Sequence, residues 1–176
     1  YSYPWDQAAG FIRGFLENGG EKVERIWHPV EAVDFSSIMA KLMGMAKEYD
    51  AVLNNSGGAQ VVAFFKQWKQ FGLDKIYPQI LGQANVPIVS MLPELGDAAL
   101  GVYSSLHYYD GNPSAANQKF RESYKKKYGQ YPDVIAVQGY DAMKVAFKAM
   151  KAIDGQVDDS KKFIEAIRKV NMTAEE

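Results

Sequence analysis

The sequence contains no cysteine and only two histidines among its 176 residues. The absence of cysteine excludes disulfide bonds, thiolate nucleophiles and thiolate metal sites. A zinc site needs several ligands at short spacing, and His28 and His107 have no such partner nearby in the sequence. We therefore expect neither a metal ion nor another cofactor.

The sequence also lacks an excess of charge of either sign. Its 20 basic and 21 acidic side chains give a formal net charge of −1, so no basic surface for DNA or RNA is predicted. No apolar run approaches the roughly 18 to 20 residues of a membrane span, and the first residues lack the features of a signal peptide. We expect no nucleic-acid partner and no direct insertion of this chain into a membrane.

Apolar residues make up 47% of the sequence and aromatic residues 13%, which is typical of a folded globular chain. Up to residue 106, short apolar runs alternate with segments of helical periodicity. The expected strands are residues 22–27, 50–54, 79–82 and 100–106. This alternation predicts an α/β fold, a Rossmann-like lobe with a mostly parallel sheet flanked by helices.

Residues 107–176 have a different pattern, with helical segments and no strand between them. The expected helices start at Asn112-Pro113, at Asp133 and at Ser160, where proline and short polar side chains are typical of a helix N-terminus. These helices cannot cover a sheet that their own segment does not supply. Their apolar faces therefore need a partner from elsewhere.

The turn Asn54-Asn55-Ser56-Gly57-Gly58 links an expected strand to an expected helix and has three interpretations. It is similar to a nucleophile elbow around Ser56, but Asn54 replaces the first glycine of that motif. His107 and Asp133 would then be the base and its orienting acid, which nothing in their spacing supports. Alternatively, free N–H groups at the helix start bind an anion or a carbonyl, or the glycines only permit a tight connection.

Three aromatic residues, Tyr1, Tyr3 and Trp5, surround Pro4 just before the first expected helix. Aromatic rings at such a connection either stack on a ligand or pack against the core of their own domain. The residues alone do not decide between these two roles.

Several different short motifs occur one after another along the chain. They are the aromatic turn at 1–5, Gly19-Gly20, Asp34-Phe35-Ser36, Asp50-Ala51-Val52, Phe71-Gly72-Leu73, residues 95–102, Lys127-Tyr128-Gly129, Pro132-Asp133 and residues 138–142. In order and spacing they resemble the periplasmic solute-binding proteins of branched-chain amino-acid-type ABC transporters, of the leucine/isoleucine/valine-binding kind. The resemblance covers nearly all of the chain, although each motif alone is weak.

The resemblance implies the type I periplasmic binding protein fold, in which two Rossmann-like lobes trap a small ligand by hinge closure. Residues 1–104 would form the second, ligand-binding lobe. Residues 105–176 would be a crossover and helices that normally cover the first lobe. The early part of the family's usual chain, which supplies the first lobe, would then be absent.

The resemblance also implies ligand contacts. Tyr3 matches a ligand-contacting tyrosine of the family, and Trp5 lies close to it in sequence. Asn55, Ser56 and Gly57 match a turn that contributes further contacts. Gly57 stands where the leucine-type members have a tyrosine.

The end of the next strand provides the last expected contact, Gln83. Ala84 follows it, where leucine-type members offer an acid to the ligand's ammonium group. An unpaired ammonium group in a closed cleft would be costly. The expected ligand is therefore an amide, urea-like or carboxylate compound rather than an α-amino acid.

The implied function is that of the extracytoplasmic solute-binding component of an ABC transporter. It would capture a small polar ligand, which is an amide, a carboxylate or an amino-acid-like compound, and deliver it to a membrane permease. No enzymatic activity is implied, and the location would be periplasmic or otherwise extracytoplasmic. The alternatives are the ligand-sensing domain of a receptor or regulator with the same fold and, less favoured, a serine hydrolase acting through Ser56.

Overall fold

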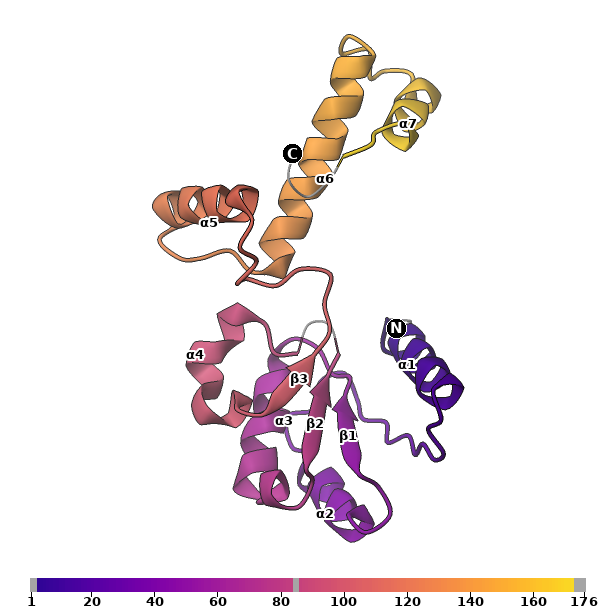
Figure 1. The fold of residues 1–176 in the computed structure, drawn as a ribbon, viewed down its shortest axis with the longest axis vertical. Helices are drawn as coiled ribbons and strands as arrows, with labels where there is room; N and C mark the ends of the chain where they lie inside the picture. Colours follow the sequence, from indigo (N-terminus) through magenta and orange to yellow (C-terminus); the bar gives the residue numbers. More distant parts are fainter. Residues whose placement is uncertain (1–2, 84–85, 173–176) are drawn as a thin grey trace. The chain divides into compact units, whose positions relative to one another are not determined.

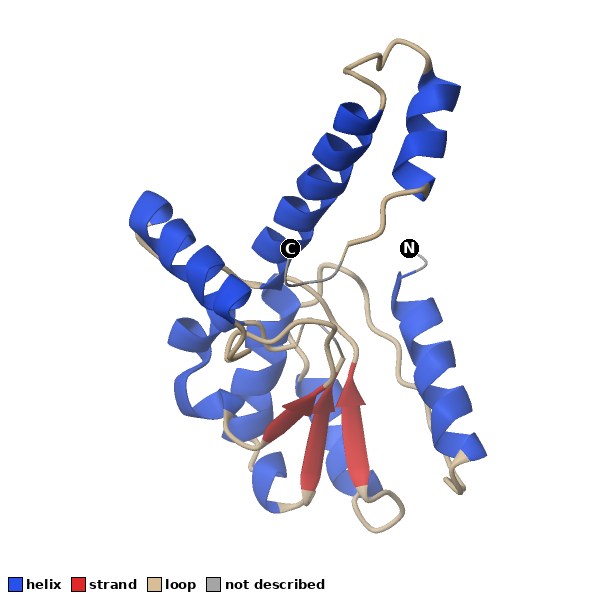
Figure 2. Cartoon of the chain, turned by 45° about the horizontal axis from the view of Figure 1, so that its top comes forward, coloured by secondary structure: helices blue, strands red, loops and turns tan. Residues whose placement is uncertain are grey.

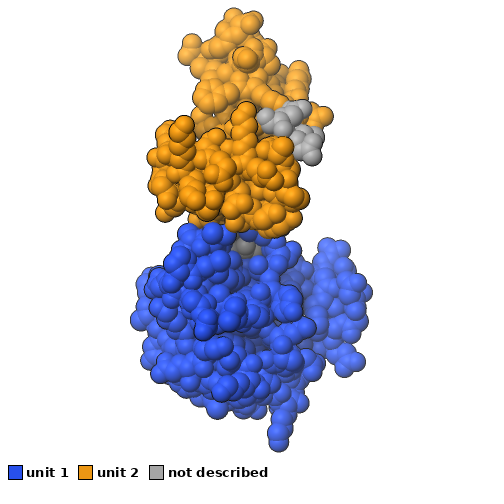
Figure 3. All heavy atoms as spheres, turned by 60° about the vertical axis from the view of Figure 1, so that its left-hand side comes forward, with its two compact units in different colours: residues 1–107 blue, residues 108–176 orange. Residues whose placement is uncertain are grey.

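The computed structural model describes residues 3–83 and 86–172. The chain divides into two compact units, residues 1–107 and 108–176 (Figure 3). The first unit contains α1 (Tyr3–Glu17), α2 (Ser36–Met45), β1 (Ala51–Asn54), α3 (Ala59–Gln70), β2 (Gln79–Gly82), α4 (Leu92–Leu95) and β3 (Val102–Ser104) (Figure 1). Short 3-10 helices span Leu73–Lys75, Val89–Met91 and Gly96–Ala99.

The sheet of the first unit is parallel, which confirms the α/β prediction. Among the described residues its strand order is β1-β2-β3, and the three arrows point the same way in Figure 2. The register places Val52, Ile80 and Val102 side by side. Because side chains alternate along a strand, these three share one face of the sheet, and Leu53, Leu81 and Tyr103 share the other.

The expected strand at 22–27 is wrong, because residues 20–29 have no regular secondary structure. This segment is held by side chains instead of by a backbone ladder. Lys22 forms an ion pair with Glu48, and Lys41 Nζ lies 3.2 Å from Glu24 Oε1. The apolar residues that suggested a strand remain partly exposed, since Val23 is 36% and Trp27 48% accessible.

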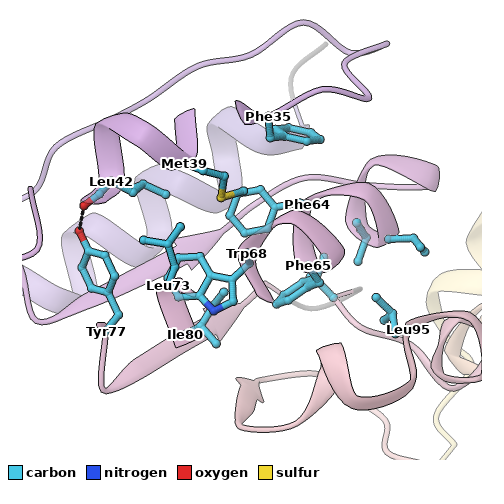
Figure 4. Close-up of a cluster of buried hydrophobic side chains, with 13 residues drawn as sticks. Phe35, Met39, Leu42, Phe64, Phe65, Trp68, Leu73, Tyr77, Ile80 and Leu95 are labelled. Atoms are coloured by element: carbon cyan, nitrogen blue, oxygen red, sulfur yellow. Dashed lines mark hydrogen bonds between the residues drawn. The ribbon is translucent and has the colours of Figure 1, made fainter. Parts of the chain in front are cut away.

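The hydrophobic core lies on the face of the sheet that carries Ile80, between the sheet and helices α2 and α3 (Figure 4). The helical periodicity of α3 explains this packing, because apolar residues three and four positions apart form one stripe. Phe35 and the two helices contribute these buried residues: Phe35, Met39, Leu42, Val61, Val62, Phe64, Phe65 and Trp68. Phe35 immediately precedes the first residue of α2.

Aromatic side chains pack in series through this core. Phe64 contacts Phe35 edge to face at 5.5 Å and lies 6.1 Å from Trp68, measured between ring centroids. Trp68 in turn lies 5.6 Å from Tyr77, whose hydroxyl donates a hydrogen bond of 2.7 Å to the Leu42 carbonyl (Figure 4). Burial raises the pKa of Tyr77.

The second unit consists of α5 (Ala115–Tyr128), α6 (Val134–Ala152) and α7 (Ser160–Arg168) (Figure 1). The N-cap predicted at Asp133 is confirmed, because its carboxylate accepts a hydrogen bond of 3.0 Å from the Ala136 amide. Helix α7 starts at Ser160 as expected, with Asp159 as its cap. The start expected at Asn112-Pro113 is displaced, since Ser114 is the cap of α5.

The second unit buries few apolar side chains. Helices α6 and α7 enclose a small cluster made of Ala149, Ile153 and Ala166. Helix α6 leaves an apolar stripe exposed at Tyr140, Met143 and Phe147. These positions are three and four residues apart, so they lie on one side of the helix.

Candidate functional site

The carboxyl ends of the three strands meet at one edge of the sheet. The register pairs Asn54 with Gly82 and Gly82 with Ser104, so the residues after β1 and β2 emerge side by side. In open parallel sheets this edge is where ligands bind. The turn at 54–58 and Gln83 therefore share one location, as expected from their positions at strand ends.

The β1–α3 turn is held together by the side chain of Asn54. Its Oδ1 accepts hydrogen bonds from the Ser56 amide at 3.0 Å and from the Ser56 hydroxyl at 2.6 Å. Asn54 and Ser56 are both buried. Gly58 then starts α3 with φ of +60°, a conformation that favours glycine. The buried Ser56 hydroxyl thus serves the turn itself.

Gln83 connects the end of β2 to this turn. Its amide N–H donates to the Asn54 carbonyl at 3.1 Å, and its side-chain Nε2 donates to the Ser56 carbonyl at 3.2 Å. The residue before it, Gly82, tolerates no side chain, because a Cβ there would collide with the Val86 carbonyl oxygen. Gln83 therefore fixes the relative positions of two loops at the sheet edge.

Asn55 links the same turn to α1. Its Nδ2 donates a hydrogen bond of 2.7 Å to the Pro4 carbonyl, 51 positions earlier in the chain. Its Oδ1 is buried and has no hydrogen-bond partner among the described residues. Asn55 is the expected contact that joins the strand edge to the aromatic segment, and it carries an unsatisfied acceptor there.

The proline and the tryptophan that were expected before the first helix lie within α1. Pro4 and Trp5 belong to the first turn of this helix, a position that accepts proline because its missing N–H would have no helical partner. The Trp5 indole is 56% accessible and stacks on Trp27, with ring centroids 4.1 Å apart and an angle of 23° between the rings. The side chain of Tyr3, and residue Ala84, lie outside the described part of the structure.

Trp27 is a residue that the sequence pattern assigned to a strand and not to a site. Its stacking on Trp5 brings it to a hollow of about 1190 Å³ that is also lined by Asn55, Ser56 and Gly57. A second hollow of about 660 Å³ lies between α1 and the strand ends, and Gln83 lines it. The only sequence signal for Trp27 was an apolar aromatic residue just before His28-Pro29, where the expected strand had to stop.

The serine hydrolase interpretation has little geometric support. Ser56 donates its hydroxyl proton to Asn54 rather than to a histidine. Asp133 caps α6 and accepts from the Ala136 amide. Within residues 3–83 and 86–172, no group of three or more potential metal ligands comes together.

Comparison with known proteins assigns the chain to a family. Residues 1–174 match the model of the periplasmic binding protein family. The chain belongs to this family. It is 32% identical to the Leu/Ile/Val-binding protein homolog 6 of Brucella melitensis. The match covers 93% of this chain and 42% of that relative.

Two solved structures support the same assignment. The ABC transporter substrate-binding protein from Sphaerobacter thermophilus is 30% identical, with a TM-score of 0.87 over 96% of this chain and 46% of that one. The ABC transporter solute-binding protein from Rhodopseudomonas palustris BisB5, solved with 3,4-dihydroxy benzoic acid, is 35% identical, with a TM-score of 0.81 over 90% of this chain and 43% of that one. The periplasmic binding protein chain thus spans less than half the length of these relatives.

The family assignment agrees with the resemblance found in the sequence, including the parallel sheet flanked by helices. Among the described helices, none combines the length and the apolar character that crossing a membrane requires.

Proposed function

We propose that this chain contributes one wall of the ligand cleft in the extracytoplasmic solute-binding component of an ABC transporter. Residues 1–104 would be the ligand-binding lobe, and residues 105–176 would cross to the other lobe and cover it with α5 to α7. The main support is that Asn55, Gln83 and the start of α1 lie together at the carboxyl edge of the sheet. Hinge closure against the other lobe would enclose the ligand, and a membrane permease would receive it.

The proposed ligand is a small carboxylate without an α-ammonium group, and an aromatic carboxylate is favoured over an amide or urea-like compound. Two observations support it. Ala84 stands in the sequence where leucine-type members carry an acid, and the 35% identical relative was solved with an aromatic acid. Among the described residues of the turn and the β2 end, the candidate contacts Asn55, Ser56 and Gln83 are neutral.

Calorimetry on the full-length protein with benzoate and with leucine tests this proposal. Benzoate should bind and leucine should not, because an ammonium group enclosed without a carboxylate partner loses several kcal/mol of hydration. Mass spectrometry of the small molecule that co-purifies with the protein provides an independent readout. Tight binding of leucine would overturn the proposed ligand class.

The isolated chain should bind the same compounds only weakly, with a dissociation constant above the micromolar range. One wall of a cleft leaves most of the ligand in water, whereas small-molecule sites bury about 70–90% of the ligand surface. Micromolar or tighter binding by residues 1–176 alone would show that the site is complete within this chain.

The variant Ser56→Ala separates binding from hydrolysis. In a binding protein it should stay folded and bind somewhat more weakly, since it loses the 2.6 Å hydrogen bond to Asn54 that orders the turn. An esterase that depended on Ser56 would instead lose its activity completely. Hydrolysis of a p-nitrophenyl ester by the parent protein, abolished in this variant, would favour the enzyme.

A further inference from the structure

Positive charge is concentrated at the end of α5 in the second unit. Residues 119–127 contain five basic side chains and one acidic side chain, whereas the rest of the sequence has 15 basic and 20 acidic side chains. Lys125, Lys126 and Lys127 are consecutive and exposed. In the part of the chain that the structure describes, none of these three lysines forms an ion pair with a carboxylate. The end of α5 is therefore a basic surface on an otherwise acidic chain.

Stabilisation of the helix explains only part of this charge. Cations near a helix C-terminus interact favourably with its dipole, and Lys125 to Lys127 lie in the last turn of α5. The effect is small for each cation and falls off beyond that turn. Lys119 lies more than two turns before the end of the helix, so the dipole does not account for it.

The three lysines cannot all be covered by one neighbouring element. A helix turns by about 100° for each residue, so Lys125 to Lys127 spread over about 200° of the circumference of α5. An ammonium group is strongly hydrated and costly to bury without a partner. Even if the other lobe covers the apolar stripe of α6, this end of α5 should therefore remain at the surface.

Tyrosine rings lie among these cations. Lys127 Nζ is 5.3 Å from the ring centroid of Tyr128, and Lys125 Nζ is 4.2 Å from that of Tyr131. Tyr128 is 57% and Tyr131 38% accessible. Tyrosine has an apolar ring and a polar hydroxyl, and lysine has an apolar stem and a charged end, so both side chains suit the boundary between lipid and water. The composition of this surface matches the headgroup region of a bilayer.

The kind of cation indicates the kind of anion. The planar guanidinium of arginine suits the fixed geometry of a carboxylate, but Arg121 is already engaged, because its Nη2 donates to Asp110 Oδ2 at 3.1 Å. The remaining cations are lysines, which are point charges on flexible stems. A lipid surface presents many phosphates in no fixed arrangement, and clustered lysines are attracted to it. A bilayer therefore fits this surface better than an acidic protein segment.

We propose that Lys125–Lys127, Tyr128 and Tyr131 form a docking surface for the anionic headgroups of a lipid bilayer. We call it the lysine–tyrosine surface. It would hold the protein at the membrane that carries the permease by electrostatic attraction, with no segment crossing the bilayer. This inference goes beyond the proposed function and does not depend on which ligand the cleft binds.

Co-sedimentation of the full-length protein with lipid vesicles tests the proposal. Vesicles of phosphatidylcholine that contain about one third phosphatidylglycerol should retain the protein at low salt, and vesicles of phosphatidylcholine alone should not. Retention should fall between about 0.01 M and 0.15 M salt, because the screening length shrinks from about 30 Å to about 8 Å.

The triple variant Lys125→Gln, Lys126→Gln, Lys127→Gln tests the place of docking. Each lysine near an anionic surface contributes about fivefold to the partition coefficient, so the variant should lose about hundredfold. The matched control is Lys47→Gln, Lys75→Gln, Lys169→Gln, which removes the same net charge from exposed lysines scattered over the chain. The control should lose about threefold or less, because scattered lysines produce no local concentration of charge.

The variant Tyr128→Ser tests the aromatic part of the surface. It should weaken retention on the phosphatidylglycerol vesicles by about threefold, because an interfacial ring is lost while the charge is unchanged. Tyr103→Ser is the control, since Tyr103 is equally exposed, at 65% accessible, but lies on β3 in the first unit. This control should bind the vesicles as the parent protein does.

Other results would overturn the proposal. Equal retention on both kinds of vesicle, or parental retention in the triple variant at 125–127, would show that these lysines do not dock on anionic lipid. Saturable binding of inorganic phosphate that the triple variant loses would identify a site for a free anion instead. Capture on poly-glutamate beads through the same lysines, without retention on vesicles, would assign the surface to an acidic protein segment.

Discussion

The two units of this chain differ in how they bury their apolar side chains. In the first unit, α2, α3 and the sheet enclose a continuous cluster in which Phe35, Phe65 and Trp68 are almost fully inaccessible. In the second unit the cluster between α6 and α7 is limited to Ala149, Ile153 and Ala166, of which two are small. Burial stabilises a fold by about 25 cal/mol for each Å² of apolar surface.

This difference indicates that the first unit carries its own core, whereas the second depends on something that covers it. Phe147 is 60% and Met143 52% accessible, although both lie on the apolar stripe of α6. A helix with such a stripe is normally packed against another element. The proposed cover is the other lobe of a two-lobed protein, in line with the relatives, which are more than twice as long as this chain.

The largest expected effect on stability comes from truncating a large side chain in the core of the first unit. Trp68→Ala should lower the free energy of unfolding by about 3–5 kcal/mol, because it leaves a cavity where the ring packs against Phe64 and Tyr77. Phe147→Ala in α6 is the matched aromatic truncation and should change stability by about 0.5 kcal/mol or less. Denaturant unfolding of both variants measures the contrast. Equal losses of unfolding free energy in the two variants would mean that Phe147 is buried in solution. The proposed difference between the two units would then be wrong.

The sequence predicted some elements of the fold correctly and others wrongly. Strands β1 and β2 were found because each is a short apolar run bounded by turn residues, and the cap at Asp133 because short acidic side chains are typical of that position. Residues 22–27 were assigned wrongly. Their composition fits a strand, but a strand also needs a neighbour, and composition carries no information about which edge is paired.

The candidate site was predictable in place but not in detail. Strand ends in a parallel sheet must meet at one edge, so the turn at 54–58 and Gln83 were expected together. The engagement of the Ser56 hydroxyl by Asn54, and of Asn55 by Pro4, depends on side-chain geometry that spacing does not encode. Trp27 was missed because its ring meets Trp5 only in the folded chain.

A second prediction concerns the helical hairpin of the second unit. Asp159 accepts hydrogen bonds from the amides of Lys161 and Lys162 at the start of α7. Asp159→Ala should destabilise this helix by about 1 kcal/mol, whereas Asp158→Ala, one residue outside the cap, should have little effect. Hydrogen exchange resolved by segment is the measurement. Faster exchange is expected in α7 alone, and a matching increase in β1 and β2 would show that the units unfold together.

A third prediction compares, at high pH, the buried Tyr77 of the first unit with the partly buried Tyr108 of the second. Burial raises the pKa of Tyr77, and burial also raises that of Tyr108, where nearby Asp110 adds to the effect and Arg121 opposes it. The unfolded chain then loses these protons at a lower pH than the folded chain. Stability is therefore intact below the ordinary tyrosine pKa of about 10 and falls as the pH rises above it toward the folded values.

Phenylalanine variants assign that alkaline loss to one unit or the other. Tyr77→Phe should cost about 1 kcal/mol at neutral pH, since it removes the hydrogen bond to Leu42, and should flatten the loss of stability in the first unit. Tyr108→Phe removes the hydrogen bond to Asn117 and should flatten the loss in the second unit. Unfolding monitored between neutral pH and about pH 11 provides the data. An unchanged slope in Tyr77→Phe would show that this hydroxyl is solvated.

The smallest effect on stability is expected from an exposed ion pair of the first unit, Lys22–Glu48. The hydrogen bond from Lys22 lowers the pKa of Glu48, so any stabilisation by this pair is present above the ordinary glutamate pKa and is lost as the pH falls through the lowered value. Both side chains are more than half accessible, and solvent and salt screen such a pair.

Glu48→Gln should therefore leave the unfolding free energy of the unit unchanged within error, as should Glu17→Gln in the exposed pair with Arg13. The two variants should differ locally, because the Lys22–Glu48 pair connects residues 20–29 to the turn after α2, whereas Arg13–Glu17 lies within α1. Hydrogen exchange should therefore increase in residues 20–29 in Glu48→Gln alone. A global loss of stability in Glu48→Gln would mean that the segment carrying Trp27 is part of the core and not an attachment to it.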